Sequence, residues 1–154
     1  MRIRLVGSFL ISLLILTACT HVSVQSNVEE YSKPCSINVT DNRPDKKMLS
    51  GSIIRSIDLT PPIETILKSK LCSNNGIFAY SAREPIFIEV NDLNFSYTDE
   101  AVFIIVASVK TRGELYTIQS IGKESYVGLP STRIGRLLDL SLDNFLQKLA
   151  IKLQ

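Results

Sequence analysis

Histidine, tryptophan and cysteine are scarce in this chain, which has one His, no Trp and three Cys. The single histidine, His21, lies in a polar stretch near the N-terminus, so residues 35–154 contain none. Without a histidine, the Ser-His-Asp and Cys-His nucleophilic arrangements and the usual zinc sites are excluded from that part of the chain. The sequence also lacks a GxxxxGK[ST] or GxGxxG phosphate-binding motif. We therefore expect no catalytic residues, no metal and no cofactor, and a protein that is not an enzyme.

Paired carboxylates are the one catalytic alternative that remains. Glu89 with Asp92, or Asp99 with Glu100, have the residue types that divide acid and base roles in a hydrolase. Both pairs fall at an expected bulge or turn, where solvated acids are common. We expect them to be surface charges.

Only one long apolar run occurs, and it lies at the N-terminus from Leu5 to Leu16, after Arg2 and Arg4. A membrane-spanning helix needs roughly 20 consecutive apolar residues, and this run is shorter. Its length and its positive flank are typical of a signal peptide over residues 1–18. An uncleaved transmembrane anchor is the alternative.

The run ends in Leu16-Thr17-Ala18-Cys19, which resembles the lipobox of bacterial lipoproteins. The resemblance implies cleavage before Cys19 and attachment of acyl chains such as palmitate, which would hold the protein in a membrane. In many enterobacterial lipoproteins an Asp after that cysteine retains the protein in the inner membrane. Thr20 stands there instead, so the expected location is the outer membrane, with the domain facing the periplasm.

The charges of the mature chain balance. Removing Arg2 and Arg4 from the 17 basic residues leaves 15, which equals the 15 acidic residues. This balance gives no reason to expect a nucleic-acid partner. It also gives no long-range attraction to anionic lipids, so the acyl chains must supply the membrane affinity.

The two cysteines beyond Cys19 form an even pair, Cys35 and Cys72. The periplasm is oxidising, and two thiols there pair when the fold brings them within reach. We expect a disulfide; two separately buried thiols are the alternative.

The periodicity of the remaining chain predicts strands and two helices in a single domain over residues 35–154. Residues 19–34 are polar and read as a flexible tether. Strands are expected over 35–41, 52–57, 86–97 with a bulge at Asn91-Asp92, 101–109 and 115–121. Helices are expected from an N-cap at Thr60 to a stop at 74–76, and from 130 to the C-terminus. This order predicts an α+β fold: a two-layer sandwich of a mostly antiparallel sheet with two helices on one face.

Sparse motifs within the domain resemble the YajG-type outer-membrane lipoproteins of Gram-negative bacteria. The carrying residues are Asp41-x-Arg43 with Asp45, a helix from Asp58-Leu59 through Leu71 closed by Gly76, and Tyr126-Val127-Gly128 before the last helix. The resemblance supports the fold and the location. It implies no particular molecular activity.

Asp41 and Arg43 allow two interpretations. The arginine could bind a partner carboxylate or phosphate in a bidentate way, or the two residues could pin the turn. For the protein as a whole we expect a non-enzymatic adaptor or accessory subunit that docks on an envelope protein. The alternative is a binding protein or sensor for a small amphiphile, such as a lipid or glycan fragment held between sheet and helices.

Overall fold

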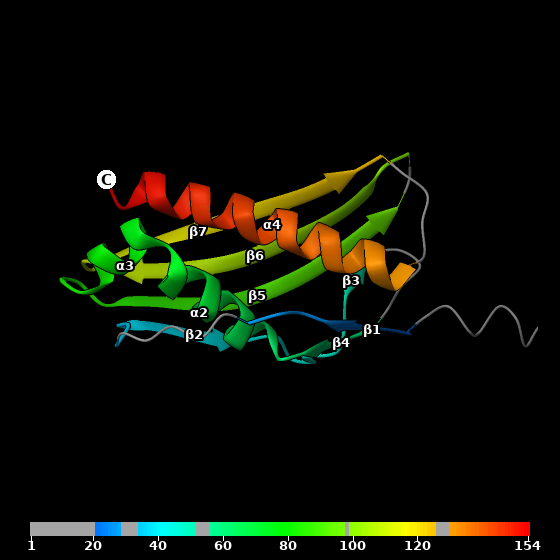
Figure 1. The fold of residues 1–154 in the computed structure, drawn as a ribbon, viewed down its shortest axis with the longest axis horizontal. Coiled ribbons are helices and arrows are strands. Elements are labelled where there is room, and N and C mark those ends of the chain that lie inside the picture. Colours follow the sequence, from blue (N-terminus) through cyan, green and yellow to red (C-terminus); the bar gives the residue numbers. More distant parts are fainter. Residues whose placement is uncertain (1–20, 29–33, 52–55, 98, 126–129) are drawn as a thin grey trace, which may run out of the picture.

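The computed structural model describes residues 21–28, 34–51, 56–97, 99–125 and 130–154, with only the backbone of residues 130–132. Helices cover one face of a main sheet, as expected for a two-layer α+β sandwich (Figure 1). The strands in chain order are β1 (His21–Gln25), β2 (Ile37–Asp41), β3 (Ser50–Gly51), β4 (Ser56–Thr60), β5 (Ile86–Tyr97), β6 (Ala101–Thr111) and β7 (Glu114–Glu124). The helices are α2 (Ile63–Ser73), α3 (Asn75–Ser81) and α4 (Pro130–Lys152).

The main sheet has the strand order β2-β5-β6-β7, with β3 also paired to β5. The β5–β6 and β6–β7 pairs are antiparallel, because the connections between them are tight turns. By contrast, β2 runs parallel to β5, and α2 and α3 form the crossover between these two strands. The expected mostly antiparallel sheet is therefore confirmed.

The expected bulge in β5 is present. The pairing of β5 with β6 shifts between Val90 and Asp92. The shift lets Ile88 and Val90 before it, and Leu93 and Phe95 after it, all face the same core.

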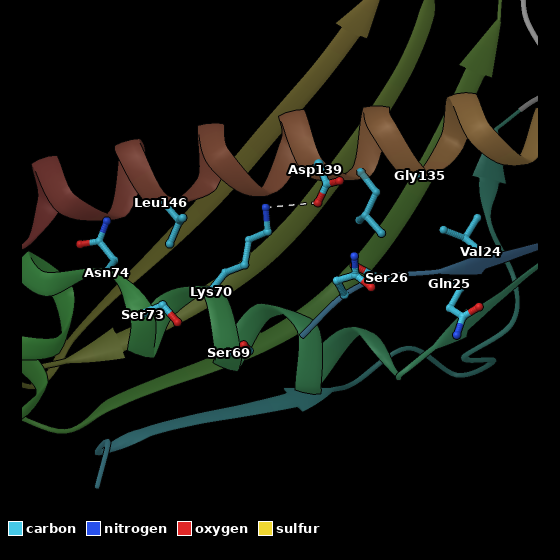
Figure 2. A pocket seen from close by; sticks show the side chains of 12 residues that line it. Val24, Gln25, Ser26, Ser69, Lys70, Ser73, Asn74, Gly135, Asp139 and Leu146 are labelled. Atoms are coloured by element: carbon cyan, nitrogen blue, oxygen red, sulfur yellow. Dashed lines mark ion pairs between the residues drawn. The ribbon is translucent and has the colours of Figure 1, made fainter. Parts of the chain in front are cut away.

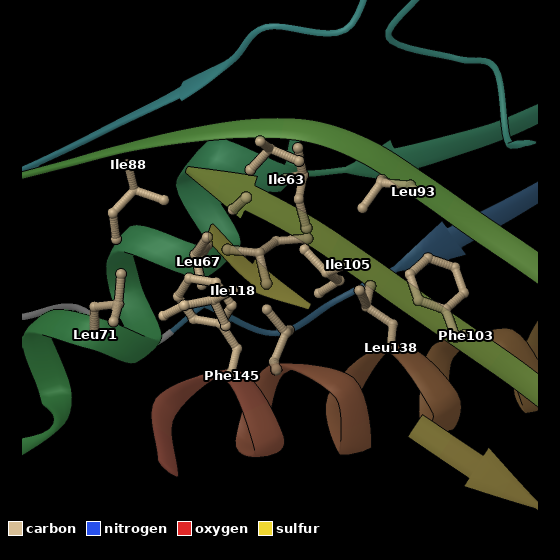
Figure 3. Close-up of a cluster of buried hydrophobic side chains, with 14 of the residues drawn as sticks. Ile63, Leu67, Leu71, Ile88, Leu93, Phe103, Ile105, Ile118, Leu138 and Phe145 are labelled. Atoms are coloured by element: carbon tan, nitrogen blue, oxygen red, sulfur yellow. The ribbon is translucent and has the colours of Figure 1, made fainter. Parts of the chain in front are cut away.

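The core lies between the sheet and the helices and is filled by aliphatic residues and phenylalanines. Figure 3 shows Leu67 and Leu71 of α2 and Phe145 of α4 in the same buried cluster as Ile105 of β6. Gly122 of β7 allows α4 to approach closely, because a Cβ atom there would lie 2.2 Å from the backbone oxygen of Leu137. The helix backbone therefore rests directly on this part of the sheet.

The first strand corrects an expectation. Residues 21–25 lie in the segment predicted to be a flexible tether, yet they form β1, which pairs in parallel with β4 from His21↔Ser56 to Gln25↔Thr60. Val22 and Val24 are only 8% and 4% exposed. The prediction is wrong for these residues. Val22 and Val24 are only two alternating apolar residues, but they are enough to form a strand because β4 provides backbone pairing and α4 provides packing. Residues 19–20 and 29–33 of the predicted tether lie outside the described residues.

The region around the first helix differs from expectation at both ends. Thr60 was expected to cap it, but Thr60 belongs to β4, and Pro62 occupies the N-cap position of α2 without a side-chain hydrogen bond. At the other end, Asn74 was expected to help stop the helix. It also starts α3, because its side-chain oxygen accepts a hydrogen bond from the Ile77 N–H at 3.1 Å. Of the strand expected over 52–57, residues 52–55 lie outside the described residues, as does Tyr126-Val127-Gly128.

Candidate functional site

The cysteine pair forms the expected disulfide. Cys35 precedes β2 and Cys72 lies in the last turn of α2, and their Cα atoms are 5.9 Å apart. The alternative of two separately buried thiols is thereby excluded. The bond ties the first strand of the main sheet to the helix that packs on it.

Asp41 and Arg43 form a closed ion pair at the end of β2. The guanidinium Nε donates to Asp41 Oδ1 at 2.8 Å and Nη2 donates to Oδ2 at 2.6 Å. The same guanidinium also donates to the carbonyl oxygens of Met48 and Lys46, at 3.0 and 2.5 Å. The side chains of Asp41 and Arg43 are only 2% and 4% exposed. This geometry matches the turn-pinning interpretation, since the guanidinium presents no open fork to a partner.

The buried pair sets the ionisation of Asp41. Burial alone would raise the pKa of this carboxyl group. The hydrogen bonds from the Arg43 side chain and backbone, together with its charge, outweigh the burial, and the pKa lies below its ordinary value. Asp41 is therefore a structural carboxylate rather than an acid poised for catalysis.

The carboxylate pairs considered for catalysis lie at the surface. Glu100 pairs with Lys123 at 3.8 Å, and Asp92 accepts a hydrogen bond from the Ser50 hydroxyl at 2.7 Å. Neither pair lines any of the cavities described below. Within the described residues no group of three or more His, Cys, Asp or Glu side chains is arranged to hold a metal ion. None of the described helices is both long and apolar enough to cross a membrane.

An open groove of about 670 Å³ lies between α2 and α4, at the end of β1. Polar side chains dominate its lining, and Lys70 reaches across it to Asp139 at 3.2 Å (Figure 2). Lys70 also pairs with Asp143 at 3.5 Å. The groove is therefore a polar surface feature, unlike the apolar space between sheet and helices that the amphiphile hypothesis expected.

One edge of the main sheet is β7, and β2 and β3 form the other. Among the described strands, β7 carries the most exposed large aliphatic side chain. Leu115 of β7 is 71% exposed, and Ile151 at the end of α4 is 69% exposed. Between the strand and the helix end lies a shallow cavity of about 340 Å³. Its lining consists of Thr117, Ile118, Gln119, Lys148, Ile151 and Lys152. We call this surface, together with Leu115, the β7 edge.

Half of the backbone groups of β7 point away from its neighbour. In an antiparallel pair the residues alternate between those that bond the partner and those that face outward. The Gln119 carbonyl faces outward, because it accepts from Lys148 Nζ at 2.6 Å, and so does the Ile121 N–H, which donates to Asn144 Oδ1 at 3.2 Å. By the same alternation Leu115 and Thr117 face outward. Side chains of α4 thus protect the second half of the edge, while the first half lies beyond these two contacts.

No motif in the sequence points to the β7 edge. A usable signal was present, because Leu115 is a large aliphatic residue at the start of a mostly polar strand. Ile151 likewise lies off the core-facing stripe of the last helix. Neither signal shows that β7 and the end of α4 line a common cavity.

Comparisons with known proteins support the fold alone. No family model and no curated protein matches the chain. A solved structure described as that of an uncharacterized protein is similar, with a TM-score of 0.50 at 10% sequence identity. The match covers 87% of this chain and 92% of that one. An identity this low carries the α+β architecture and no activity.

Proposed function

We propose that this protein is a lipid-anchored adaptor of the bacterial envelope, without enzymatic activity, that docks another envelope protein. Acyl chains on Cys19 would hold it in the outer membrane, with the folded domain in the periplasm. The lipobox-like Leu16-Thr17-Ala18-Cys19 and the YajG-like motifs support this location. The balanced charge of the mature chain fits anchoring by lipid rather than by surface charge.

The observation that carries the docking function is the β7 edge. Unpaired N–H and C=O groups on an edge strand are a template for an added strand, and proteins that bind extended peptides in this way use side-chain pockets for specificity. At the β7 edge the outward backbone groups of Leu115 and Thr117 lie beside exposed apolar side chains and a cavity of about 340 Å³. The expected occupant is therefore an extended segment of a partner protein, with an apolar side chain in the cavity.

The charges around the edge narrow the choice of partner. Lys148 and Lys152 line the cavity, and Lys110 pairs with Leu115 across the hairpin. These cations favour a segment that carries Asp or Glu beside its apolar residues. A second copy of this chain would bring its own lysines against them, so like charges oppose self-pairing.

A proline on the edge tests this function. Thr117→Pro removes an outward N–H without removing a hydrogen bond from the β6–β7 ladder. Thr117→Val keeps the N–H and is the matched control. A photo-crosslinking amino acid at Leu115 in each background, followed by mass spectrometry of solubilised envelopes, identifies the partner segment.

We expect the wild type and Thr117→Val to crosslink to an acidic, apolar extended segment, and Thr117→Pro to lose that product by at least tenfold. Thermal unfolding checks that both variants fold. Undiminished crosslinking in folded Thr117→Pro protein would argue against strand addition at this edge.

The second candidate is a binding protein for a small amphiphile, and the groove between α2 and α4 is where its polar head group would bind. Ser73 lines the groove at an exposed position, so Ser73→Trp should fill it with little cost to the core. Lipid or glycan that copurifies with the wild type and is lost from Ser73→Trp would favour this candidate. Retention of the crosslinked protein partner by the same variant would favour the adaptor.

A further inference from the structure

The start of β1 restricts how the domain sits on a membrane. Only Thr20 separates Cys19 from His21, the first residue of β1. Two residue steps span at most about 7 Å. If Cys19 carries the acyl chains, as the proposed function holds, the lipid attachment point therefore lies within about 7 Å of the His21 Cα atom.

His21 is itself held by the fold. Its ring nitrogens contact Ser56 Oγ at 2.9 Å and Asp58 at 3.2 Å. The strand it opens pairs with β4 over its five residues, and Val22 and Val24 are buried in the core. Releasing β1 to act as a tether would expose both valine side chains to water, which is unfavourable.

We infer that the domain is held end-on against the phospholipid head groups, without a tether, by the end of the molecule at which β1 begins. We define this membrane-facing end by His21, Lys47, Met48 and Ser56. Met48 forms an isolated bridge with Ser56, the strand partner of His21, so the four residues adjoin. Met48 is 56% exposed, and its apolar side chain suits insertion among head groups.

The charges of this end fit that role. Lys47 pairs with Asp58 at 3.2 Å, and nearby Arg136 of α4 pairs with Glu124 of β7 at 2.5 Å. The cations at this end are therefore paired with neighbouring carboxylates. The end carries no strong electrostatic field that would attract or repel lipid head groups. The short connection to Cys19, rather than charge, sets the orientation.

The same orientation lifts the β7 edge away from the membrane. Gly135, near the start of α4, packs against Val24 of β1, while the C-terminus lies at the opposite end of the molecule (Figure 1). The 23 residues of α4 span about 34 Å. At its far end Lys152 lies over the Tyr116 ring, at 5.6 Å. A partner would thus be engaged at the end of the molecule that points away from the head groups.

Quenching of a fluorophore by lipids with nitroxide-labelled head groups tests the orientation. The acylated full-length protein is placed in phosphatidylethanolamine–phosphatidylglycerol vesicles with a fluorophore on Met48→Cys or on Leu115→Cys. Cys35 and Cys72 are joined to each other, so the new thiol is labelled selectively. A control protein carries ten Gly and Ser residues inserted between Thr20 and His21.

We expect at least fivefold stronger quenching at position 48 than at position 115, and a much smaller difference after the insertion. Equal quenching at both positions, or no effect of the insertion, overturns the end-on orientation and leaves the anchor intact. Vesicle flotation of each protein comes first. A protein that does not float overturns both the anchor and the orientation, which separates the two failures.

Discussion

At the scale of single residues, Asp41 and Arg43 form a buried ion pair with several hydrogen bonds. A buried ion pair is not by itself strong evidence of stability, because desolvating two charges is costly. Here each charge is matched, and Arg43 additionally satisfies the carbonyl oxygens of two loop residues. The pair therefore fixes the loop that leads from β2 towards the membrane-facing end.

Removing one residue of this ion pair should destabilise the fold, because the charge of the other residue then remains buried without a partner. Arg43→Met leaves the Asp41 carboxylate buried without its partner, and we expect a loss of about 3–5 kcal/mol in the free energy of unfolding. Urea unfolding measures this loss. Arg83→Met, at an exposed position, should change stability by less than about 0.5 kcal/mol. Equal small effects of the two substitutions would contradict the structural role.

The lowered pKa of Asp41 predicts a pH dependence. The folded state binds the proton of this carboxyl group more weakly than the unfolded state, so its contribution is fully present above the unfolded pKa of about 3.9. The contribution is lost as the pH falls from about 4 through the lower folded value.

Urea unfolding at several pH values measures the free energy of unfolding of wild type and of Asp41→Asn. The gap, meaning the difference between the two free energies, should be largest near pH 7 and should narrow near pH 3. Asp99→Asn, at an exposed turn position, serves as the control and should show a constant small gap. A gap for Asp41→Asn that widens on acidification would reverse the assigned sign.

At the scale of elements, the molecule depends on contacts between segments that are distant in the chain. β1 pairs with β4, and β2 pairs with β5. The Cys35–Cys72 disulfide joins the start of one such strand to α2, across a sequence separation of 37 residues.

The disulfide should stabilise the fold without determining it. For a loop of this length the chain-entropy model gives about 3–4 kcal/mol, which for a small domain corresponds to a fall of several degrees or more in Tm. We expect reduction, or Cys35→Ser with Cys72→Ser, to lower Tm while leaving the far-UV circular dichroism unchanged. An unchanged Tm, or two maleimide-reactive thiols in the native oxidised protein, would contradict this expectation.

At the scale of the whole molecule, lipid attachment and docking are proposed at opposite ends. The inferred membrane-facing end contains His21, two residues after Cys19 in the sequence, and the β7 edge lies at the far end of α4. An adaptor of this kind needs no cleft, because its two functional surfaces are an anchor and an edge strand.

Processing of the N-terminus tests the anchor. Cys19→Ala should abolish labelling by a palmitate analogue and leave an unprocessed precursor, visible as a slower band on gels. Thr20→Ser is the matched control and should be labelled normally. Because Thr20 replaces the Asp of inner-membrane retention, density fractionation should recover the wild type with the outer membrane. Normal labelling of Cys19→Ala would refute lipidation, and recovery in the inner membrane would refute the sorting.

Local patterns in the sequence determined much of this architecture. The alternation over residues 86–97, with its shift at Asn91-Asp92, predicts both β5 and its bulge, and the stripe that includes Leu138 and Phe145 predicts α4. The even pair Cys35 and Cys72 predicts the disulfide. These features follow from periodicity and composition, which are encoded within a few turns of helix or a few residues of strand.

Only the tertiary structure decided the rest. His21–Gln25 becomes a strand because β4, 35 residues further along the chain, supplies its partner, and pairing between distant segments leaves no local signature. The closed fork of Arg43 and the β7 edge are also non-local. The first needs a folded loop, and the second brings Thr117 and Gln119 of β7 to the same cavity as Ile151 of α4. Local sequence thus specified the elements whose periodicity is strong, such as β5 and α4. Packing decided whether weaker segments such as His21–Gln25 form strands, and which side chains are buried, paired or available to a partner.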